Sequence, residues 1–371
     1  MQRDLVLRAS TGDHDAFASL IAFAKTSAMA AIVVIASACS GSTASSTSPS
    51  PSAPTSTPTL IPITVLDGEP WIAYEWLQEG KDTKDLFLVR PDGSDAHVIA
   101  TDAPGRHYSP SWSPDGSRIA FTVRDSATPE GSIWTANADG SGATLLSAGG
   151  DTCPVGLFHS NWSPDGTKLA VVCYPGGDVT ESIAVMDVAT KAITRLDTVV
   201  HPEAMNNQPT WSPDGRWIAF DVVRFDPTVT FATGWLVAVV PAAGGQVRRL
   251  TTFETFMAHP DWSPNGQELV VNSYDIHDIR STDQPSNLYT MKPDGSDLRQ
   301  LTHSSVDGTM RIGQPHWSPD GTQIVVSVAM SEPPDINISS LWLGFVSATG
   351  GEPELLPPTI HGSQPDLRPT P

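Results

Sequence analysis

Positive charge is scarce in this sequence of 371 residues. Lys and Arg number 21 against 41 Asp and Glu, so the formal net charge at pH 7 is −20. A surface this acidic repels the phosphate backbone, and we therefore expect no nucleic-acid partner. The 29 Gly and 33 Pro make up about a sixth of the chain, which disfavours a helix bundle and suits a protein of short strands and turns.

The sequence also lacks the motifs of common catalytic and metal sites. It contains no Gly-x-Ser-x-Gly nucleophile elbow, and its 10 His include no pair four residues apart. No Cys-x-x-Cys motif occurs among the 3 Cys. We therefore expect no metal and no other cofactor, and a non-catalytic role is favoured over an enzymatic one.

No apolar run reaches the ~20 residues that a helix needs to span a bilayer. The longest, residues 28–38, has the length of a signal-peptide core, follows Lys25 and leads through small residues into Cys39. This arrangement resembles a bacterial lipoprotein signal, which implies lipidation of Cys39 and attachment to the cell envelope. Ala36 departs from the Leu that the family usually carries there. An ordinary secretory signal is the alternative, and both export the chain.

Two further segments flank this signal. Residues 1–22, with Asp4-Leu5-Val6 and Ala16-Phe17, resemble the opening helix of an extracytoplasmic-function sigma factor. The match ends where the signal begins and lacks the segments with which that family binds promoter or polymerase, so it carries no function over. Residues 39–59 are rich in Ser, Thr and Pro, cannot bury apolar surface and are expected to form an extended tether.

One pentapeptide recurs through the rest of the chain. Trp-Ser-Pro-Asp-Gly stands at 112–116, 162–166, 211–215 and 317–321, and Trp-Ser-Pro-Asn-Gly stands at 262–266. Pro presets the second position of a type I turn, Asp favours the third, and Gly accepts the left-handed conformation that closes a short hairpin loop. Each copy is therefore predicted to be a hairpin corner with a buried Trp at the strand end.

A second turn follows in each unit, for example at Pro91–Ser94 and Pro293–Ser296, and apolar strands such as Leu86–Val89 lie between the two turns. Four strands in about 50 residues predict one blade of a β-propeller. From about residue 60 to the C-terminus the repeat resembles the TolB-like, WD40-like propeller family.

The two ends of the repeat region determine the expected number of blades. Asp67-Gly68 marks a first unit without its own Trp-Ser-Pro strand, and Gln364-Pro365 echoes Gln314-Pro315 at the other end. We therefore expect an all-β, six-bladed propeller over residues 60–371, closed by the C-terminal strand pairing into the first blade.

If Cys39 is lipidated, Cys153 and Cys173 remain in an oxidising compartment, on either side of the corner at 162–166. Strand register places them near each other without placing them clearly opposite. A disulfide and two separate buried thiols both stay open.

One polar register repeats three residues before each of the five corner Trp and, if the C-terminal strand closes the ring, three residues before Leu367. Its members are Ser109, His159, Gln208, His259, Gln314 and Gln364. The residue next but one is also polar in every unit, at Ser111, Asn161, Thr210, Asp261, His316 and Asp366. Because the first strand of a propeller blade lies nearest the central axis, we expect these rows to line the channel. They either hydrate it or form a binding ring.

Three functional hypotheses follow. The leading one is a non-catalytic, monomeric, lipid-anchored envelope scaffold that binds a protein or a glycan. The alternative is a polysaccharide lyase or hydrolase with His159 and His259 as acid and base. A third, based on residues 1–22, is an external sensor linked to a sigma factor.

Overall fold

The computed structural model describes the repeat region and not the segments before it. The described residues are 68–77, 83–100, 102–125, 131–176, 181–196, 198, 200, 204–225, 232–274, 286–303, 310–330 and 341–369. The predicted signal at 28–38, Cys39, the tether at 39–59 and the sigma-like residues 1–22 lie outside them. Within the described ranges, no helix has the length and apolarity to cross a membrane.

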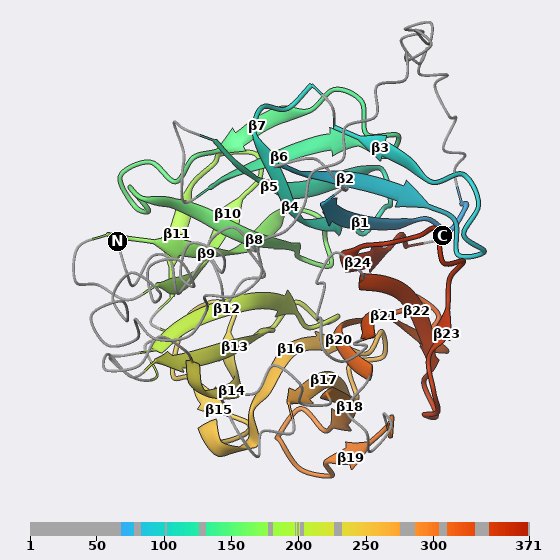
Figure 1. The fold of residues 1–371 in the computed structure, drawn as a ribbon. Coiled ribbons are helices and arrows are strands. Elements are labelled where there is room, and N and C mark those ends of the chain that lie inside the picture. The colour runs from blue at the N-terminus through green and yellow to red at the C-terminus, as the bar shows by residue number, and fades with distance from the viewer. Residues whose placement is uncertain are drawn as a thin grey trace, which may run out of the picture. The chain divides into compact units, whose positions relative to one another are not determined.

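Four sheets have four antiparallel strands each (Figure 1). The first runs β24 (Ser363–Leu367), β1 (Ile72–Leu77), β2 (Lys84–Val89) and β3 (His97–Ile99). The second comprises β4 (Arg106–Trp112), β5 (Arg118–Arg124), β6 (Ser132–Asn137) and β7 (Thr144–Ser147). The third comprises β8 (Gly156–Trp162), β9 (Lys168–Tyr174), β10 (Ser182–Asp187) and β11 (Ile193–Arg195). The fourth comprises β12 (Ala204–Trp211), β13 (Trp217–Phe225), β14 (Ala232–Pro241) and β15 (Arg248–Arg249).

The fifth sheet has eight strands and follows the 3₁₀ turn η1 (Phe253–Thr255). Its strands are β16 (Met257–Trp262), β17 (Leu269–Tyr274), β18 (Ser286–Met291), β19 (Arg299–Gln300), β20 (Met310–Trp317), β21 (Gln323–Met330), β22 (Leu341–Ser347) and β23 (Glu354–Leu355). The start of β20 pairs in parallel with the start of β18 through Ser286 and Arg311, and Ser286 Oγ donates to the carbonyl of Ile312 at 2.8 Å.

The all-β propeller expectation is confirmed, but the predicted number of separate blades is wrong. The expectation of six separate blades, closed into a ring by the C-terminal strand, is corrected to four separate four-stranded blades and one eight-stranded sheet. The physical reason is the early start of β20, whose first residues reach the start of β18 and join two four-strand groups into one hydrogen-bonded sheet.

The C-terminal strand β24 lies at one end of the first sheet. It pairs antiparallel with β1, with Leu367 opposite Ile72 and a register shift between Ala73 and Glu75. It also contacts β20 and β4, so that it lies between strands distant in sequence. The Arg368 backbone N–H donates to the carbonyl of Trp71 at 2.7 Å, and Arg368 Nε donates to the carbonyl of Gly116 at 2.8 Å.

The corner motif forms the predicted hairpin turn. In the first copy, Ser113 Oγ donates to Asp115 Oδ1 at 2.6 Å and accepts the backbone N–H of Arg118 at 2.9 Å. Gly116 has a φ of +65°, which an L-residue with a side chain rarely adopts. A Cβ at Gly215 would lie 3.4 Å from Pro164, so successive corners are in contact around the molecule.

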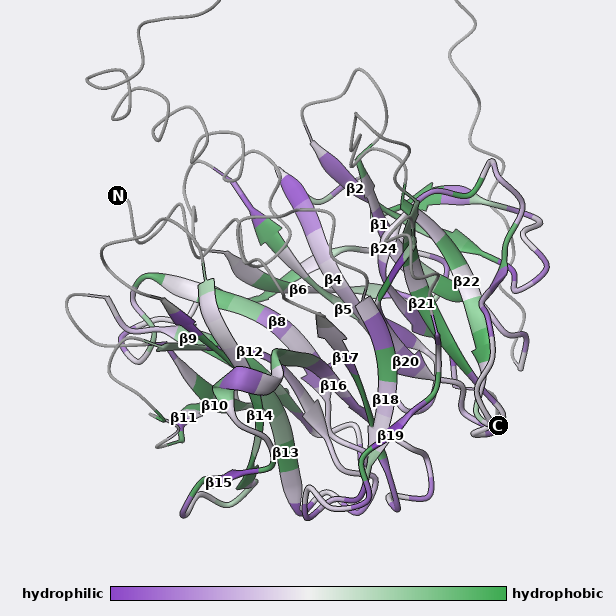
Figure 2. Ribbon diagram, turned by 60° about the horizontal axis from the view of Figure 1, so that its bottom comes forward, coloured by the Kyte–Doolittle hydropathy of each residue, from purple (hydrophilic) through white to green (hydrophobic). Residues whose placement is uncertain are grey.

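The core lies on both faces of the middle strands, because each face packs against a neighbouring sheet rather than facing solvent. Ile119, Leu169, Ile218, Leu269 and Ile324 occupy one repeated register and are fully buried. Figure 2 shows largely hydrophobic β13 and β22, whereas β4 and β20 carry hydrophilic stretches. The polar side chains are thus concentrated on the first strands, where the candidate ring was expected.

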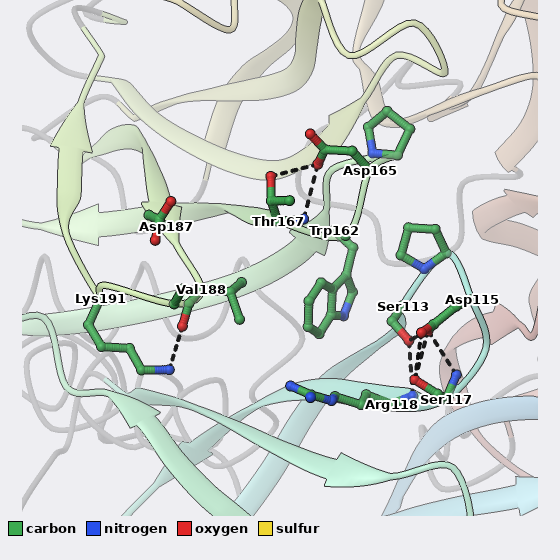
Figure 3. Close-up of a pocket in the computed structure, with 14 residues that line it drawn as sticks. Ser113, Asp115, Ser117, Arg118, Trp162, Asp165, Thr167, Asp187, Val188 and Lys191 are labelled. Carbon is green, nitrogen blue, oxygen red and sulfur yellow. Dashed lines mark hydrogen bonds between the residues drawn. The ribbon is translucent and has the colours of Figure 1, made fainter.

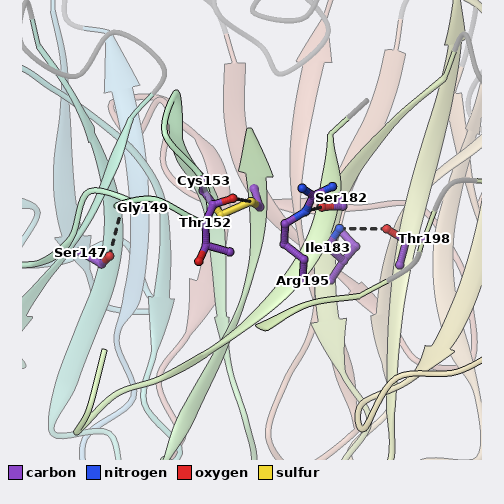
Figure 4. Close-up of a disulfide and its surroundings, with 9 residues drawn as sticks. Ser147, Gly149, Thr152, Cys153, Ser182, Ile183, Arg195 and Thr198 are labelled. Atoms are coloured by element: carbon purple, nitrogen blue, oxygen red, sulfur yellow. Dashed lines mark hydrogen bonds between the residues drawn. A yellow bond between two sulfur atoms is a disulfide. The ribbon is translucent and has the colours of Figure 1, made fainter. Parts of the chain in front are cut away.

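A disulfide joins Cys153 to Cys173 (Figure 4). The sequence had left open whether these two residues form a disulfide or remain separate thiols. It ties the turn before β8 to the second strand of the same sheet, and both residues are fully buried in the hydrophobic cluster of that blade. The turn is also held by the Cys153 backbone N–H, which donates to the carbonyl of Gly149 at 3.2 Å.

Candidate functional site

All six residues of the predicted polar ring have the same unusual backbone conformation. Their φ values lie between 43° and 52°, in the left-handed region. Each occupies the first strand of its unit, where the register to the neighbouring strand shifts, as between Tyr108 and Ser111. A β-bulge of this kind redirects a side chain out of the pleat. The sequence shows the polar repeat but carries no sign of the bulge, because none of the six is Gly.

The bulge side chains contact one another across neighbouring strands. Ser109 Oγ and His159 Nδ1 lie 2.9 Å apart, and the Gln364 backbone N–H donates to Gln314 Oε1 at 3.0 Å. His259 Nδ1 lies 2.6 Å from Oδ1 of Asn272 on β17. The structure therefore brings Ser109 to His159 and Gln314 to Gln364, whereas His259 contacts the next strand of its own sheet.

Three amide and imidazole nitrogens of this ring are buried without a partner among the described residues. They are His159 Nε2, Gln208 Nε2 and Gln364 Nε2. A buried polar atom without a hydrogen bond is unfavourable by about 1–3 kcal/mol. These nitrogens are the groups of the ring that remain available to a ligand or to water.

The second polar row joins the first strands to each other. Asp366 Oδ2 accepts the Trp112 backbone N–H at 2.6 Å, Asp261 Oδ2 accepts that of Trp317 at 2.8 Å, and Asn161 Oδ1 accepts that of Trp211 at 2.9 Å. The Thr210 hydroxyl donates to Asp261 at 3.0 Å. Each bond crosses from one unit of the repeat to the next, so this row has a structural role.

His316 lies between two of these carboxylates. Its Nδ1 is 3.9 Å from Asp261 Oδ2 and 3.8 Å from Asp366 Oδ1. Burial raises the pKa of Asp366 to about 6, and it also raises the pKa of Asp261. The Asp–His–Asp arrangement thus brings together side chains of β16, β20 and β24.

Burial lowers the pKa of both candidate catalytic histidines. It lowers the pKa of His259 to about 4, and that of His159 lies well below 6.5 because of burial and the nearby positive groups. Both are therefore neutral at pH 7, and each has its Nδ1 engaged by Ser109 or Asn272. A general acid needs a pKa near the working pH, so this pair is poorly suited to that role.

A second candidate site, which the sequence analysis missed, lies between two hairpin corners. It is a groove of about 990 Å³ formed by the β4–β5 corner, the β8–β9 corner and the turn at Asp187–Lys191. Figure 3 shows the Trp162 indole between the two corners, with Arg118 below it and Lys191 to one side. We call this the Arg118 groove.

The Arg118 groove collects charges of both signs. Asp115, Asp165 and Asp187 line it, together with Arg118 and Lys191. Hydrogen bonds from Ser163 and Thr167 lower the pKa of Asp165 to about 2, so its carboxylate is ionised at any physiological pH. Burial and the neighbouring Arg118 lower the pKa of Lys191. The sequence did contain a signal for this groove: the residue type two places after each corner Gly differs from unit to unit.

A second groove of about 630 Å³ lies between the fourth sheet and the corner at 262–266. In this groove Trp217 occupies the repeat position that Arg118 has in the first groove, and Glu268 occupies the repeat position of Lys168. The guanidinium of Arg248 lies over the Trp217 ring at 5.3 Å and donates to the Pro293 carbonyl, and Lys292 pairs with Asp297 at 2.9 Å. Its cations are thus already engaged.

Comparison with known proteins identifies relatives of part of the chain. Residues 155–327 match the family model described as the TolB beta propeller domain. An uncharacterized protein of Agrobacterium fabrum is 34% identical over 173 residues, which are 45% of this chain and 53% of that protein. The uncharacterized peptidase YuxL of Bacillus subtilis is 28% identical over 220 residues, 52% of this chain and 32% of the peptidase. The matches thus span about half and a third of these relatives.

Solved structures extend the likeness to most of the chain. TolB from Acinetobacter baumannii superposes with a TM-score of 0.59 at 17% identity, covering 81% of this chain and 67% of that one. At this identity the superposition shows a common fold and nothing about activity. Together with the match over residues 155–327, it shows that the described part of the chain has the fold of a TolB-like β-propeller.

Proposed function

We propose that this chain is a non-catalytic scaffold of the bacterial cell envelope, whose TolB-like propeller binds a protein partner. The observation that carries the proposal is the use of the inner polar groups. Asp366, Asp261 and Asn161 each accept a backbone N–H group of another unit, so these side chains serve the joins between units. A propeller built in this way is a rigid platform, and its exposed hairpin corners are the surfaces left for recognition.

The location in the envelope rests on residues 28–39, which have the pattern of a lipoprotein signal. We infer that Cys39 carries the lipid, that residues 39–59 tether the propeller to the membrane, and that the exported protein acts as a monomer. Residues 1–22 take no part in this function.

The anchor is tested by Cys39→Ser. The protein is expressed in a bacterial host, and detergent phase separation measures its partition. The native protein is expected in the detergent phase and the variant in the aqueous phase, because lipidation requires the thiol. Equal partition of the two would remove the lipid anchor from the proposal.

The partner is sought by crosslinking in intact membranes. The native protein, purified under denaturing conditions after crosslinking, is expected to retrieve defined proteins that an unrelated lipoprotein of similar charge does not. Retrieval of polysaccharide without protein would favour a glycan partner. Depletion of a polysaccharide in a substrate screen, lost in the His159→Gln, His259→Gln double variant, would replace the scaffold by an enzyme.

A further inference from the structure

We propose that the Arg118 groove is a docking site for an acidic segment of the protein partner, with a carboxylate of that segment bound between Arg118 and Lys191. This inference rests on the proposed function, because it names the chemistry of the partner that the scaffold binds. It concerns the corner surface between the second and third sheets, which is separate from the polar ring.

The two cations reach the groove from different sheets. Arg118 is the first residue of β5, whereas Lys191 belongs to the turn between β10 and β11. Both are exposed, and both line the groove beside the Trp162 indole (Figure 3). Pro114 and Pro164 complete the wall, so that a bound chain would find apolar surface next to the charges.

The carboxylates of the groove are already bonded within their own turns. Asp115 accepts hydrogen bonds from Ser113 and from the hydroxyl and backbone N–H of Ser117. Asp165 is bonded in the same way to Ser163 and Thr167. These bonds make the carboxylates part of the corner structure and reduce their capacity to accept a partner's donors.

The Asp187 carboxylate is likewise bonded to the backbone N–H and hydroxyl of Thr190, at 2.7 and 2.8 Å. All three acidic side chains of the groove are therefore engaged by their own turns. A cationic partner would meet carboxylates whose Oδ1 atoms already accept these bonds.

The cations are less engaged. Lys191 donates one bond, to the carbonyl of Val188 at 2.6 Å, which leaves two of its three N–H groups. The Arg118 guanidinium has no hydrogen bond or ion pair within the described part of the chain. Burial, and after it the repulsion by Arg118, lowers the pKa of Lys191. A carboxylate between the two cations would replace this repulsion by two charge-assisted hydrogen bonds.

Among the residues that the structure describes, the second groove lacks this arrangement of unpaired cations. There the register of Arg118 holds Trp217, the register of Lys168 holds Glu268, and Lys292 is paired with Asp297. A partner that recognises unpaired cations would thus select the Arg118 groove. Arg216, 81% exposed on the corner of β12–β13, offers a matched control for the loss of a surface cation.

The experiment uses fluorescein-labelled tetraglutamate and tetralysine peptides with the exported full-length chain, at low ionic strength. We expect the native protein to bind tetraglutamate more tightly than tetralysine. Arg118→Ala and Lys191→Ala should each weaken tetraglutamate binding about tenfold, whereas Arg216→Ala should leave it unchanged. Circular dichroism melts of all variants should coincide, because the three side chains are exposed.

Three results would overturn the proposal. These are tighter binding of tetralysine, equal binding of tetraglutamate by all three variants, and complete displacement of tetraglutamate by inorganic phosphate at equal concentration, which would indicate a small-anion site. The membrane crosslinking separates this failure from that of the scaffold. If an Arg118→Glu, Lys191→Glu variant retrieves the same partners as the native protein, the groove is wrong and the scaffold stands; if the native protein retrieves none, the scaffold itself fails.

Discussion

Replacing the buried carboxylate Asp221 by Asn is expected to stabilise the protein in a strongly pH-dependent way. Asp221 is 1% exposed on β13, opposite Asn207 of β12. From the described residues it accepts a long hydrogen bond, at 3.4 Å from the His259 backbone N–H. Burial raises its pKa from 3.8 to about 7. Asn is nearly isosteric and can accept the same bond, so the substitution removes the charge and little else.

The sign follows from proton linkage. In the folded protein Asp221 keeps its proton up to about pH 7, whereas in the unfolded chain it releases the proton near pH 3.8. Between these values the folded state binds more protons, so the contribution of Asp221 to stability falls as the pH rises. At 1.36 kcal/mol per pH unit, the penalty reaches about 4 kcal/mol above pH 7, and about 3 kcal/mol of it develops between about pH 5 and pH 8.

Urea unfolding of the native protein and of Asp221→Asn at the two pH values measures this difference. The stabilisation by Asn should be larger at about pH 8 than at about pH 5 by about 3 kcal/mol. Asp165→Asn is the control, because its pKa of about 2 makes any effect constant over this range, and Asn265 already forms the same turn in another unit. An equal effect of Asp221→Asn at both pH values would refute the reasoning.

Three further predictions concern the sheet, the disulfide and the ring. Deletion of residues 362–371 removes β24 from β1 and the bond from Asp366 to Trp112, and should lower the free energy of unfolding by at least about 4 kcal/mol; an unchanged melting temperature would contradict this. Cys153→Ser with Cys173→Ser should lower it by about 3 kcal/mol, a loss that a reductant reproduces only in the native protein. Because the pKa of His259 is about 4 when folded, stability falls as the pH drops from 6.5 to 4, and His259→Gln should remove about 3 kcal/mol of that fall in acid melts.

The hairpin corners could be predicted from the sequence because their chemistry is local. Ser113 and Asp115 bond within one turn, and the same types of bond recur at Ser318 and Asp320. The polar register was also visible, since Ser109 and His159 stand at one position of the repeat. Their left-handed backbone was not visible, because no Gly marks the position and the bulge arises from the pairing of two strands.

The features that escaped prediction depend on contacts between units. The pairing of β18 with β20 depends on how far β20 extends before its corner. The residue types of Ser286 and Arg311, which form this pair, do not indicate that length. The Arg118 groove is formed by residues of two sheets. The placement of the two cations Arg118 and Lys191 in one groove has no counterpart in the repeat pattern. Periodicity thus reports what the units share, whereas a specific site is built from the positions at which they differ.

The pairing of Leu367 with Ile72 has a consequence for how the chain could be rearranged. Trp112 faces Ile119 in the same register, and there the six residues 113–118 connect the two strands. A linker of that length, with the sequence of a corner, would therefore carry the chain from β24 directly into β1. A circular permutant made with this linker and opened at another corner would keep every strand pair of the described propeller, with its new ends at a place chosen by the experimenter.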